Sequence, residues 1–189
     1  MLYTRKGDNG TTKLFNCPQG KRLSKSTVVF EALGTLDELN CSLGFAVALA
    51  KKSHSTLEMS GQKTEYVTII EHLQNTLFII QAELGGANKH PSKVDVDFAE
   101  FIVAEIEKVL PPVTSFIVPG GGKIGAYLDV CRTIARRAER SVIKVFEEDE
   151  QFVSEITLQF LNRLSSALYA LARFANYQGG FLEHPPGYG

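Results

Sequence analysis

Apolar residues recur at helical spacing along most of this chain, and the longest such stretch covers residues 28–52. One apolar stripe runs through Leu36 and Leu43, and a second runs through Leu33 and Cys41. A helix that is apolar nearly all round is expected at the centre of a fold. The sequence therefore predicts a helical core organised around this segment.

Four further stretches show the same periodicity and predict helices. They cover residues 65–85, about 95–110, 125–147 and 152–177. Residues 4–26 predict a loop or a pair of short extended pieces, and residues 53–64 predict a polar connection. No segment shows a strong strand pattern, so we expect an all-α bundle of five helices, about 30 Å or more in length.

The 189 residues predict a single domain, 1–189, with an N-terminal loop (1–26), a bundle (27–178) and a C-terminal tail (179–189). Hydrophobic residues make up 44% and charged residues 22%, which is typical of a globular chain rather than a disordered one. The net charge of -1 provides no broad basic surface. We therefore expect binding neither to nucleic acid nor to a membrane.

The three cysteines are widely spaced and form no CxxC pair, so the sequence predicts neither a disulfide framework nor a thiolate zinc site. None of the histidines stands in a Glu-x-x-His motif, and we expect no metal held by the side chains of the chain. The first residues contain no apolar signal core, and there is no uncharged apolar run of 18 or more. These features predict a cytoplasmic protein, or an organellar one if an upstream targeting segment was removed.

The segment Cys131–Arg140 concentrates positive charge on one helical stripe. Arg132, Arg136 and Arg140 follow each other at intervals of four, with Glu139 beside them. Like charges at this spacing repel, so the stripe requires carboxylates or a bound anion opposite it. Guanidinium groups suit both carboxylate and phosphate geometry. The alternative is a solvated basic helix face.

Two other places carry charge with structural consequences. The stretch Thr4–Lys13 combines glycines, hydroxyls and cations, which is typical of a loop that wraps a polyphosphate and equally of a flexible tail. Asp37 lies on a stripe of the 28–52 helix that we expect to be buried, where a carboxylate needs an arginine partner. Arg132 is a candidate partner, and the alternative is that Asp37 lies at a bundle edge facing water.

A glycine loop follows Phe116. Gly120, Gly122 and Gly125 satisfy GxGxxG, but helices surround the loop and a dinucleotide site requires a preceding strand. Lys123 is not followed by Ser or Thr, so the loop is not a Walker A motif either. On its own, Phe116 predicts core packing.

Four separated pieces of the sequence together carry a resemblance. They are Thr4–Thr12, Leu33–Asn40, Phe116–Gly121, and Arg132–Arg140 followed by Phe160–Ser165. In this order, and over nearly the whole chain, they resemble the PduO-type ATP:cob(I)alamin adenosyltransferases. The resemblance implies a five-helix bundle assembled as a homotrimer with ATP at each subunit interface. It also implies transfer of the 5'-deoxyadenosyl group of ATP to the cobalt of reduced cobalamin, with Mg²⁺ present and triphosphate released. Further partners would be a cob(II)alamin reductase or an adenosylcobalamin-dependent enzyme.

The resemblance also assigns roles to individual positions. It implies a catalytic role for four of them. Asp37 and Arg132 match an inter-subunit ion pair, Phe116 matches the aromatic residue that displaces the lower cobalt ligand, and Arg136 belongs to the ATP site. The ATP site implied by the family consists of an N-terminal part, Thr4, Arg5, Lys6, Gly7, Thr12, Lys13 and Lys25, and a part across the interface, Arg136, Arg137, Ala138, Glu139, Arg140 and Asn162.

One position departs from the family pattern. The family usually continues Asn-Arg-Leu-Ser with Asp, whereas Ser166 stands there in this chain. Two rival readings remain: a non-catalytic trimer that binds ATP or adenosylcobalamin, and a helical scaffold that binds no nucleotide.

Overall fold

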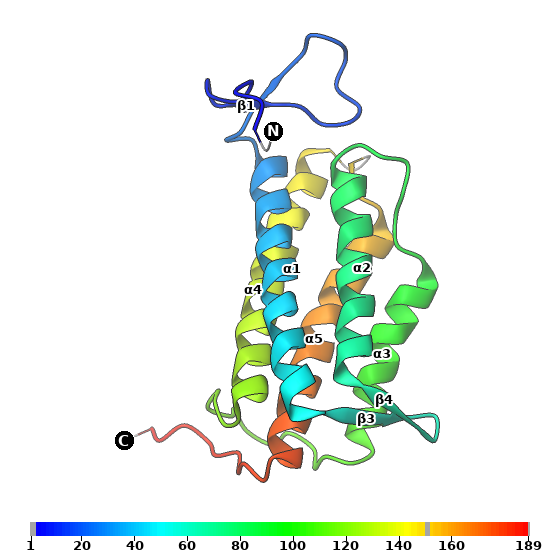
Figure 1. The fold of residues 1–189 in the computed structure, drawn as a ribbon, viewed down its shortest axis with the longest axis vertical. Coiled ribbons are helices and arrows are strands. Elements are labelled where there is room, and N and C mark those ends of the chain that lie inside the picture. Colours follow the sequence, from blue (N-terminus) through cyan, green and yellow to red (C-terminus); the bar gives the residue numbers. More distant parts are fainter. Residues whose placement is uncertain (1–2, 150–151, 189) are drawn as a thin grey trace.

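The computed structural model describes residues 3–149 and 152–188. The outer residues of the predicted N-terminal loop and C-terminal tail, and residues 150–151 before the last helix, lie outside the described part. Within it, five α-helices stand side by side along one long axis (Figure 1). They are α1 Val28–Ser53, α2 Tyr66–Leu84, α3 Lys93–Glu107, α4 Lys123–Glu148 and α5 Glu155–Gln178. The predicted five-helix bundle is confirmed.

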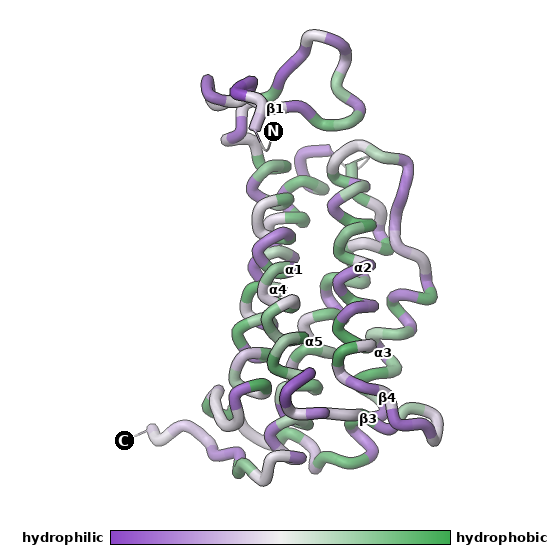
Figure 2. Tube along the Cα trace, viewed as in Figure 1, coloured by the Kyte–Doolittle hydropathy of each residue, from purple (hydrophilic) through white to green (hydrophobic). Residues whose placement is uncertain are grey.

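The helices meet through their predicted apolar stripes. α5 packs against α4 and α3, and α1 packs against α4 and α2. Leu36 and Leu43 of α1 and Phe160 of α5 are fully buried. Figure 2 shows apolar segments recurring along the helices, while hydrophilic residues dominate the N-terminal loop. Because each helix hides one face from water, hydrophobic burial holds the five helices in one bundle. No helix in the described ranges has the length and apolar character that a membrane crossing requires.

A β-hairpin joins α1 to α2, and here the prediction of a strandless polar connection is wrong. Strands β3 (Thr56–Met59) and β4 (Gln62–Glu65) pair in antiparallel fashion. Leu57 and Met59 alternate inward and are buried, which ties the hairpin to the core. Ser60 and Gly61 both have positive φ, 50° and 77°, as a two-residue hairpin turn requires. The alternation lasts only four residues within a polar segment, so the sequence signal was weak.

The N-terminal arm, residues 3–26, lies beyond the start of α1, at the opposite end of the bundle from the hairpin (Figure 1). Its strands β1 (Thr11–Thr12) and β2 (Leu23–Ser24) pair in antiparallel fashion, which confirms the predicted pair of short extended pieces. Two contacts fix the arm to the bundle. The side chain of Leu14 is buried, and the amide of Phe15 donates to the carbonyl of Gly85 at 2.7 Å.

The loop before α4 is fastened to α5 by one amide side chain. The backbone N–H of Gly122 donates to Oδ1 of Asn176 at 3.0 Å, and Nδ2 of Asn176 donates to the carbonyl of Gly120 at 2.8 Å. Gly121 has φ of 101°, and a Cβ there would lie 2.5 Å from Asn176 Oδ1. Glycine is therefore required at this turn both by its backbone conformation and by the close approach of Asn176.

Candidate functional site

A pocket of about 380 Å³ opens where α4, α5 and the loop before α4 meet. Phe116, Arg132 and Arg136 line it, so the fold brings together three of the four residues for which a catalytic role is predicted. Phe116 is 81% exposed, which excludes the alternative that it packs in the core of the chain. An exposed aromatic ring beside two guanidinium groups is typical of a ligand site rather than of a packed interior.

Arg132 is held in place from two sides. Its Nε donates to Oδ1 of Asp129 at 2.8 Å, and its guanidinium lies 5.6 Å from the ring centre of Tyr169 on α5. Burial raises the pKa of the Tyr169 hydroxyl, so this ring stays neutral beside the cation. The sequence-based site omitted Asp129 and Tyr169. Asp129 could have been found from its position three residues before Arg132 on one helix face.

Arg136 lies one turn further along α4 and differs from Arg132. Its side chain is exposed, and among the described residues its guanidinium has neither an ion-pair nor a hydrogen-bond partner. Only its backbone carbonyl is used, as an acceptor for the guanidinium of Arg140 at 3.0 Å. A guanidinium without a carboxylate beside it is available to an anionic ligand.

Two further charged side chains of α4 have partners on neighbouring helices. Arg137 pairs with Glu38 of α1, and Glu139 accepts a hydrogen bond from Nδ2 of Asn162 at 3.0 Å. Ala138 is fully buried, so its methyl group serves the contact between helices. On the stripe itself Asp129 neutralises Arg132, and among the described residues Arg136 is the unneutralised cation within the pocket.

Asp37 is exposed, so the expectation that its stripe of α1 is buried is wrong for the single chain. The reason is that no other described helix covers this stripe, on which Cys41 and Ala48 are exposed as well. Arg132 takes Asp129 as its partner within the chain. The ion pair between Asp37 and Arg132 that the resemblance implies between subunits stays a prediction.

The N-terminal arm forms a closed turn around Lys25. Nζ of Lys25 donates to the carbonyl of Gly7 at 3.1 Å, and the backbone N–H of Lys25 donates to the carbonyl of Gly10 at 2.9 Å. Arg5 has φ of 59°, in the left-handed region. The predicted ATP residues of the arm surround this turn: Thr4, Arg5, Lys6 and Lys13 are exposed, and Gly7 and Thr12 are partly buried. Such a turn presents several exposed cations on a glycine-bearing loop, as an anion site needs.

The arm and Arg136 do not meet within one chain. The arm lies near the end of α4 at Glu148, and the twelve residues from Arg136 to Glu148 rise about 18 Å along the helix. Among the described residues, no hydrogen bond or ion pair joins the arm to the arginines of α4. Completion of an ATP site by a neighbouring subunit therefore stays a prediction.

The fold and the pocket define a class: a helical-bundle protein with arginines on one helix, an exposed aromatic ring and a glycine-bearing N-terminal arm. The sequence model of the cobalamin adenosyltransferases matches residues 2–175. The chain belongs to the cobalamin adenosyltransferase family.

Individual relatives of the chain are corrinoid adenosyltransferases. The corrinoid adenosyltransferase PduO of Salmonella typhimurium is 38% identical over 91% of the chain. A corrinoid adenosyltransferase of Mycobacterium tuberculosis is 34% identical over 98% of the chain and 94% of its own length. The human corrinoid adenosyltransferase MMAB is 34% identical over 96% of the chain and 71% of its own length. The chain spans about half the length of the PduO relatives, 49% of the Citrobacter freundii protein and 48% of the Salmonella protein.

Solved structures show the same architecture. A variant of the PduO-type ATP:corrinoid adenosyltransferase from Lactobacillus reuteri, complexed with cobalamin and ATP, superposes with a TM-score of 0.85 at 27% identity and covers 98% of this chain and 99% of its own. Another variant of that enzyme, complexed with ATP, gives a TM-score of 0.80 at 28% identity over 98% and 100% of the two chains.

Proposed function

We propose that this protein is an ATP:cob(I)alamin adenosyltransferase, which converts ATP and reduced cobalamin to adenosylcobalamin and triphosphate. The observation that carries the proposal is the pocket in which Phe116, Arg132 and Arg136 meet. It is supported by the similarity to a structure of the Lactobacillus reuteri enzyme with both cobalamin and ATP.

The proposed reaction requires positioning and charge neutralisation, but no general base. Cobalt(I) donates its electron pair to C5' of ATP and forms the Co–C bond, while the C5'–O bond breaks and its electron pair leaves with the triphosphate. The protein must hold C5' in line with cobalt and stabilise the departing negative charge. Arg136 is free to bind the triphosphate, and the turn around Lys25 supplies further N–H groups and cations.

Phe116 acts on cobalt from the other side. Its exposed ring stands in the same pocket as Arg132 and Arg136, where it can occupy the lower face of the corrin and keep out the lower ligand and water. Removal of an axial ligand favours the reduced metal, so this apolar ring makes cobalt easier to reduce. The electrons themselves come from a separate reductant, such as a cob(II)alamin reductase.

We propose that Mg²⁺ binds together with ATP. In the described part of the chain no three His, Cys, Asp or Glu side chains gather as a metal site. Mg²⁺ commonly binds through substrate phosphates and keeps several waters. We therefore expect it to arrive on the triphosphate, whose charge it lowers together with Arg136.

The proposed assembly is a homotrimer in the cytoplasm, where the bacterial relatives suggest the enzyme acts. An apolar face on α1 and α4 supports the assembly: Phe45 is 54% exposed, Val130 is 46% exposed, and the rings of Phe45 and Tyr127 lie 4.7 Å apart. Asp37 and Cys41 are exposed on α1 as well. A second copy covering this face would give Asp37 a partner and bring its own arm towards Arg136. Sedimentation at low micromolar concentration tests this, and a monomer would contradict it.

The activity test uses the complete chain with ATP, Mg²⁺, hydroxocobalamin and a strong reductant under anaerobic conditions. We expect the corrinoid spectrum to change to that of adenosylcobalamin with many turnovers per subunit, and no change without ATP. Formation of at most one equivalent would instead support a binding protein. A scaffold that binds no nucleotide predicts no thermal shift, whereas ATP at 100 times its Kd should add about 2.7 kcal/mol to the free energy of unfolding.

A further inference from the structure

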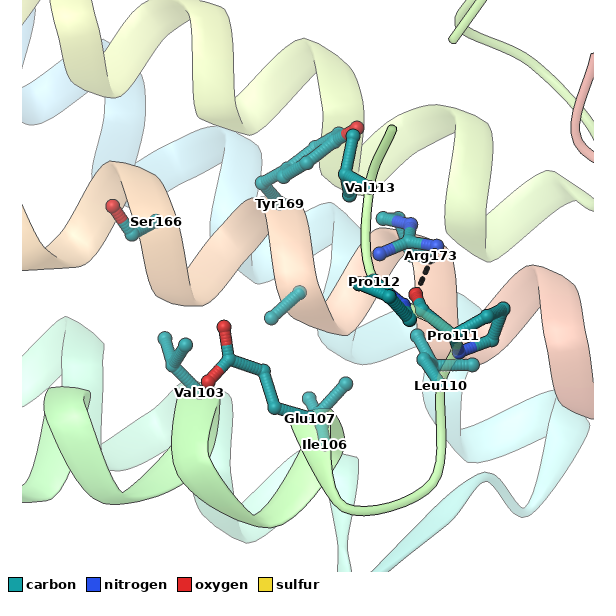
Figure 3. A pocket seen from close by; sticks show the side chains of 11 residues that line it. Val103, Ile106, Glu107, Leu110, Pro111, Pro112, Val113, Ser166, Tyr169 and Arg173 are labelled. Carbon is teal, nitrogen blue, oxygen red and sulfur yellow. Dashed lines mark hydrogen bonds between the residues drawn. The ribbon is translucent and has the colours of Figure 1, made fainter. Parts of the chain in front are cut away.

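A second and larger pocket, of about 530 Å³, lies between α3 and α5 and is closed at one end by the segment that follows α3 (Figure 3). Val103 and Ile106 of α3, Leu110 and Ala170 form an apolar wall. This volume lies within the range of about 300–1,000 Å³ that is usual for sites of small organic ligands. Arg132, Arg136, Arg140 and the residues of the N-terminal arm do not line this α3–α5 pocket. The ligand-binding roles assigned above therefore give it no function.

The α3–α5 pocket adjoins the pocket of Phe116. Val113, Ser166 and Tyr169 line both of them. In Figure 3, Val113 and Tyr169 lie near each other at one side, and Ser166 stands one turn away on the same helix. The small side chain of Ser166 keeps this boundary open, whereas the longer carboxylate that is usual in the family would extend into it. A ligand at Phe116 can therefore place a second group in the α3–α5 pocket.

Charge at the α3–α5 pocket selects the kind of group. Arg173 is engaged by both oxygens of Glu183 at 2.7 Å and by the carbonyl of Pro111 at 3.3 Å, and the hydrogen bond with Glu183 raises the pKa of Arg173. Glu107 has no ion-pair or hydrogen-bond partner in the described residues. With its cation neutralised and one carboxylate free, the pocket disfavours a phosphate. It suits an apolar aromatic ring that is neutral or weakly basic.

We propose that the α3–α5 pocket receives the aromatic base of cobalamin when that base is displaced from the lower face of cobalt. The inference rests on the proposed function. When Phe116 takes the lower face, the bond between cobalt and the benzimidazole nitrogen breaks, and the electron pair stays on the nitrogen, so no redox partner is needed. The released bicyclic ring passes Ser166 and packs its faces on Val103 and Ile106. Its freed nitrogen takes up a proton from solvent and donates towards the carboxylate of Glu107. The pocket thereby makes the enzyme selective for corrinoids that carry an aromatic lower base.

The test is a comparison of two substrates in two variants. Val103→Trp fills the α3–α5 pocket, and Ala104→Trp places the same ring on the exposed side of the same helix turn as the matched control. Cobalamin carries the base, and cobinamide lacks it. We expect Val103→Trp to raise the KM for cobalamin about tenfold and to leave the KM for cobinamide unchanged, because only the base loses its apolar contacts. Ala104→Trp should change neither.

A measurement on the wild-type protein tests the inference even if Val103→Trp fails to fold. Free 5,6-dimethylbenzimidazole should raise the KM for cobalamin and leave adenosylation of cobinamide unaffected. Adenosylation of both corrinoids with no effect of the free base, and with equal effects of Val103→Trp on both, would overturn the inference and leave the proposed function intact. Failure of the wild-type protein to adenosylate either corrinoid would overturn both.

Discussion

The pocket side of the bundle and the N-terminal arm hold their cations in opposite ways. Arg132 is fixed by the carboxylate of Asp129 and the ring of Tyr169, both on packed helices. Lys25 is held by carbonyls of its own turn, in an arm whose side chains are mostly exposed. The pocket side is therefore organised before any ligand arrives. In the proposed function, the exposed cationic side chains of the arm are ordered only when ATP binds, and part of the binding energy is spent on that ordering.

This difference separates stability from ligand recognition. Burial of the apolar faces of α4 and α5 stabilises the fold, while the exposed cations at Arg136 and Lys25 contribute little to it. Substitutions of buried residues should accordingly change the free energy of unfolding, and substitutions of the exposed cations should change the binding and use of ATP.

The largest effect is expected in the core. Phe160→Ala removes a fully buried ring of α5 and should lower the free energy of unfolding by about 4 kcal/mol through lost burial and a residual cavity. Chemical denaturation measures it, with exposed Gln159→Ala as the control. A loss below about 1 kcal/mol would mean that the core can collapse around the site and is less rigid than the contrast requires.

The second effect lies in the pocket. Arg136→Ala should reduce kcat/KM for ATP about 100-fold, because a guanidinium that meets developing charge on the triphosphate is lost. The melting temperature should hardly change, since the side chain is exposed and unpaired among the described residues. Lys144→Ala, an exposed cation two turns further along α4, is the control. Parallel losses of activity and melting temperature in Arg136→Ala would assign this arginine to the fold instead.

The arm should show a smaller and purely ligand-dependent effect. Lys25→Ala removes an exposed cation and its hydrogen bond to Gly7, and we expect the KM for ATP to rise about tenfold with an unchanged melting temperature without ATP. Steady-state kinetics and thermal shifts with and without ATP measure this. Exposed Lys21→Ala of the same arm should behave as wild type. An equal rise of KM in both variants would indicate a general effect of charge rather than a site.

The smallest effect concerns the hydrogen bonds that cap the N-terminus of α3. Burial raises the pKa of Asp95, but hydrogen bonds from Ser92 and Thr76 outweigh it and hold the pKa below its ordinary value of 3.8. The unfolded chain thus takes up this proton at higher pH than the folded one. The resulting stability is present above about pH 4 and is lost as the pH falls through the depressed pKa. Denaturation between pH 5 and 3 should show a shallower decline for Asp95→Asn, and parallel curves would exclude these hydrogen bonds as a source of stability.

Sequence reasoning recovered the helices because long stripes such as that of α5 repeat the same signal over many turns. It missed the hairpin, whose strands are four residues long and gain their burial from Leu57 and Met59 alone. For the pocket it supplied Phe116, Arg132 and Arg136, chiefly through resemblance. It did not supply Tyr169, because contact between α5 and α4 depends on how two helices pack and not on spacing within either one. Asp37 was expected to be buried because its stripe of α1 is apolar, but no other described helix of the single chain covers that stripe.

The hydrogen bonds between Asn176 and the loop at Gly120–Gly122 limit how Phe116 can move. Since the amide of Asn176 grips the backbone on both sides of Gly121, the end of the loop nearest α4 is anchored. In the proposed function, any movement of the Phe116 ring over a corrin therefore has to come from backbone rotation within residues 111–117. Asn176→Ala would remove this anchor, so the ring could take a wider range of positions and would be placed less accurately below the metal.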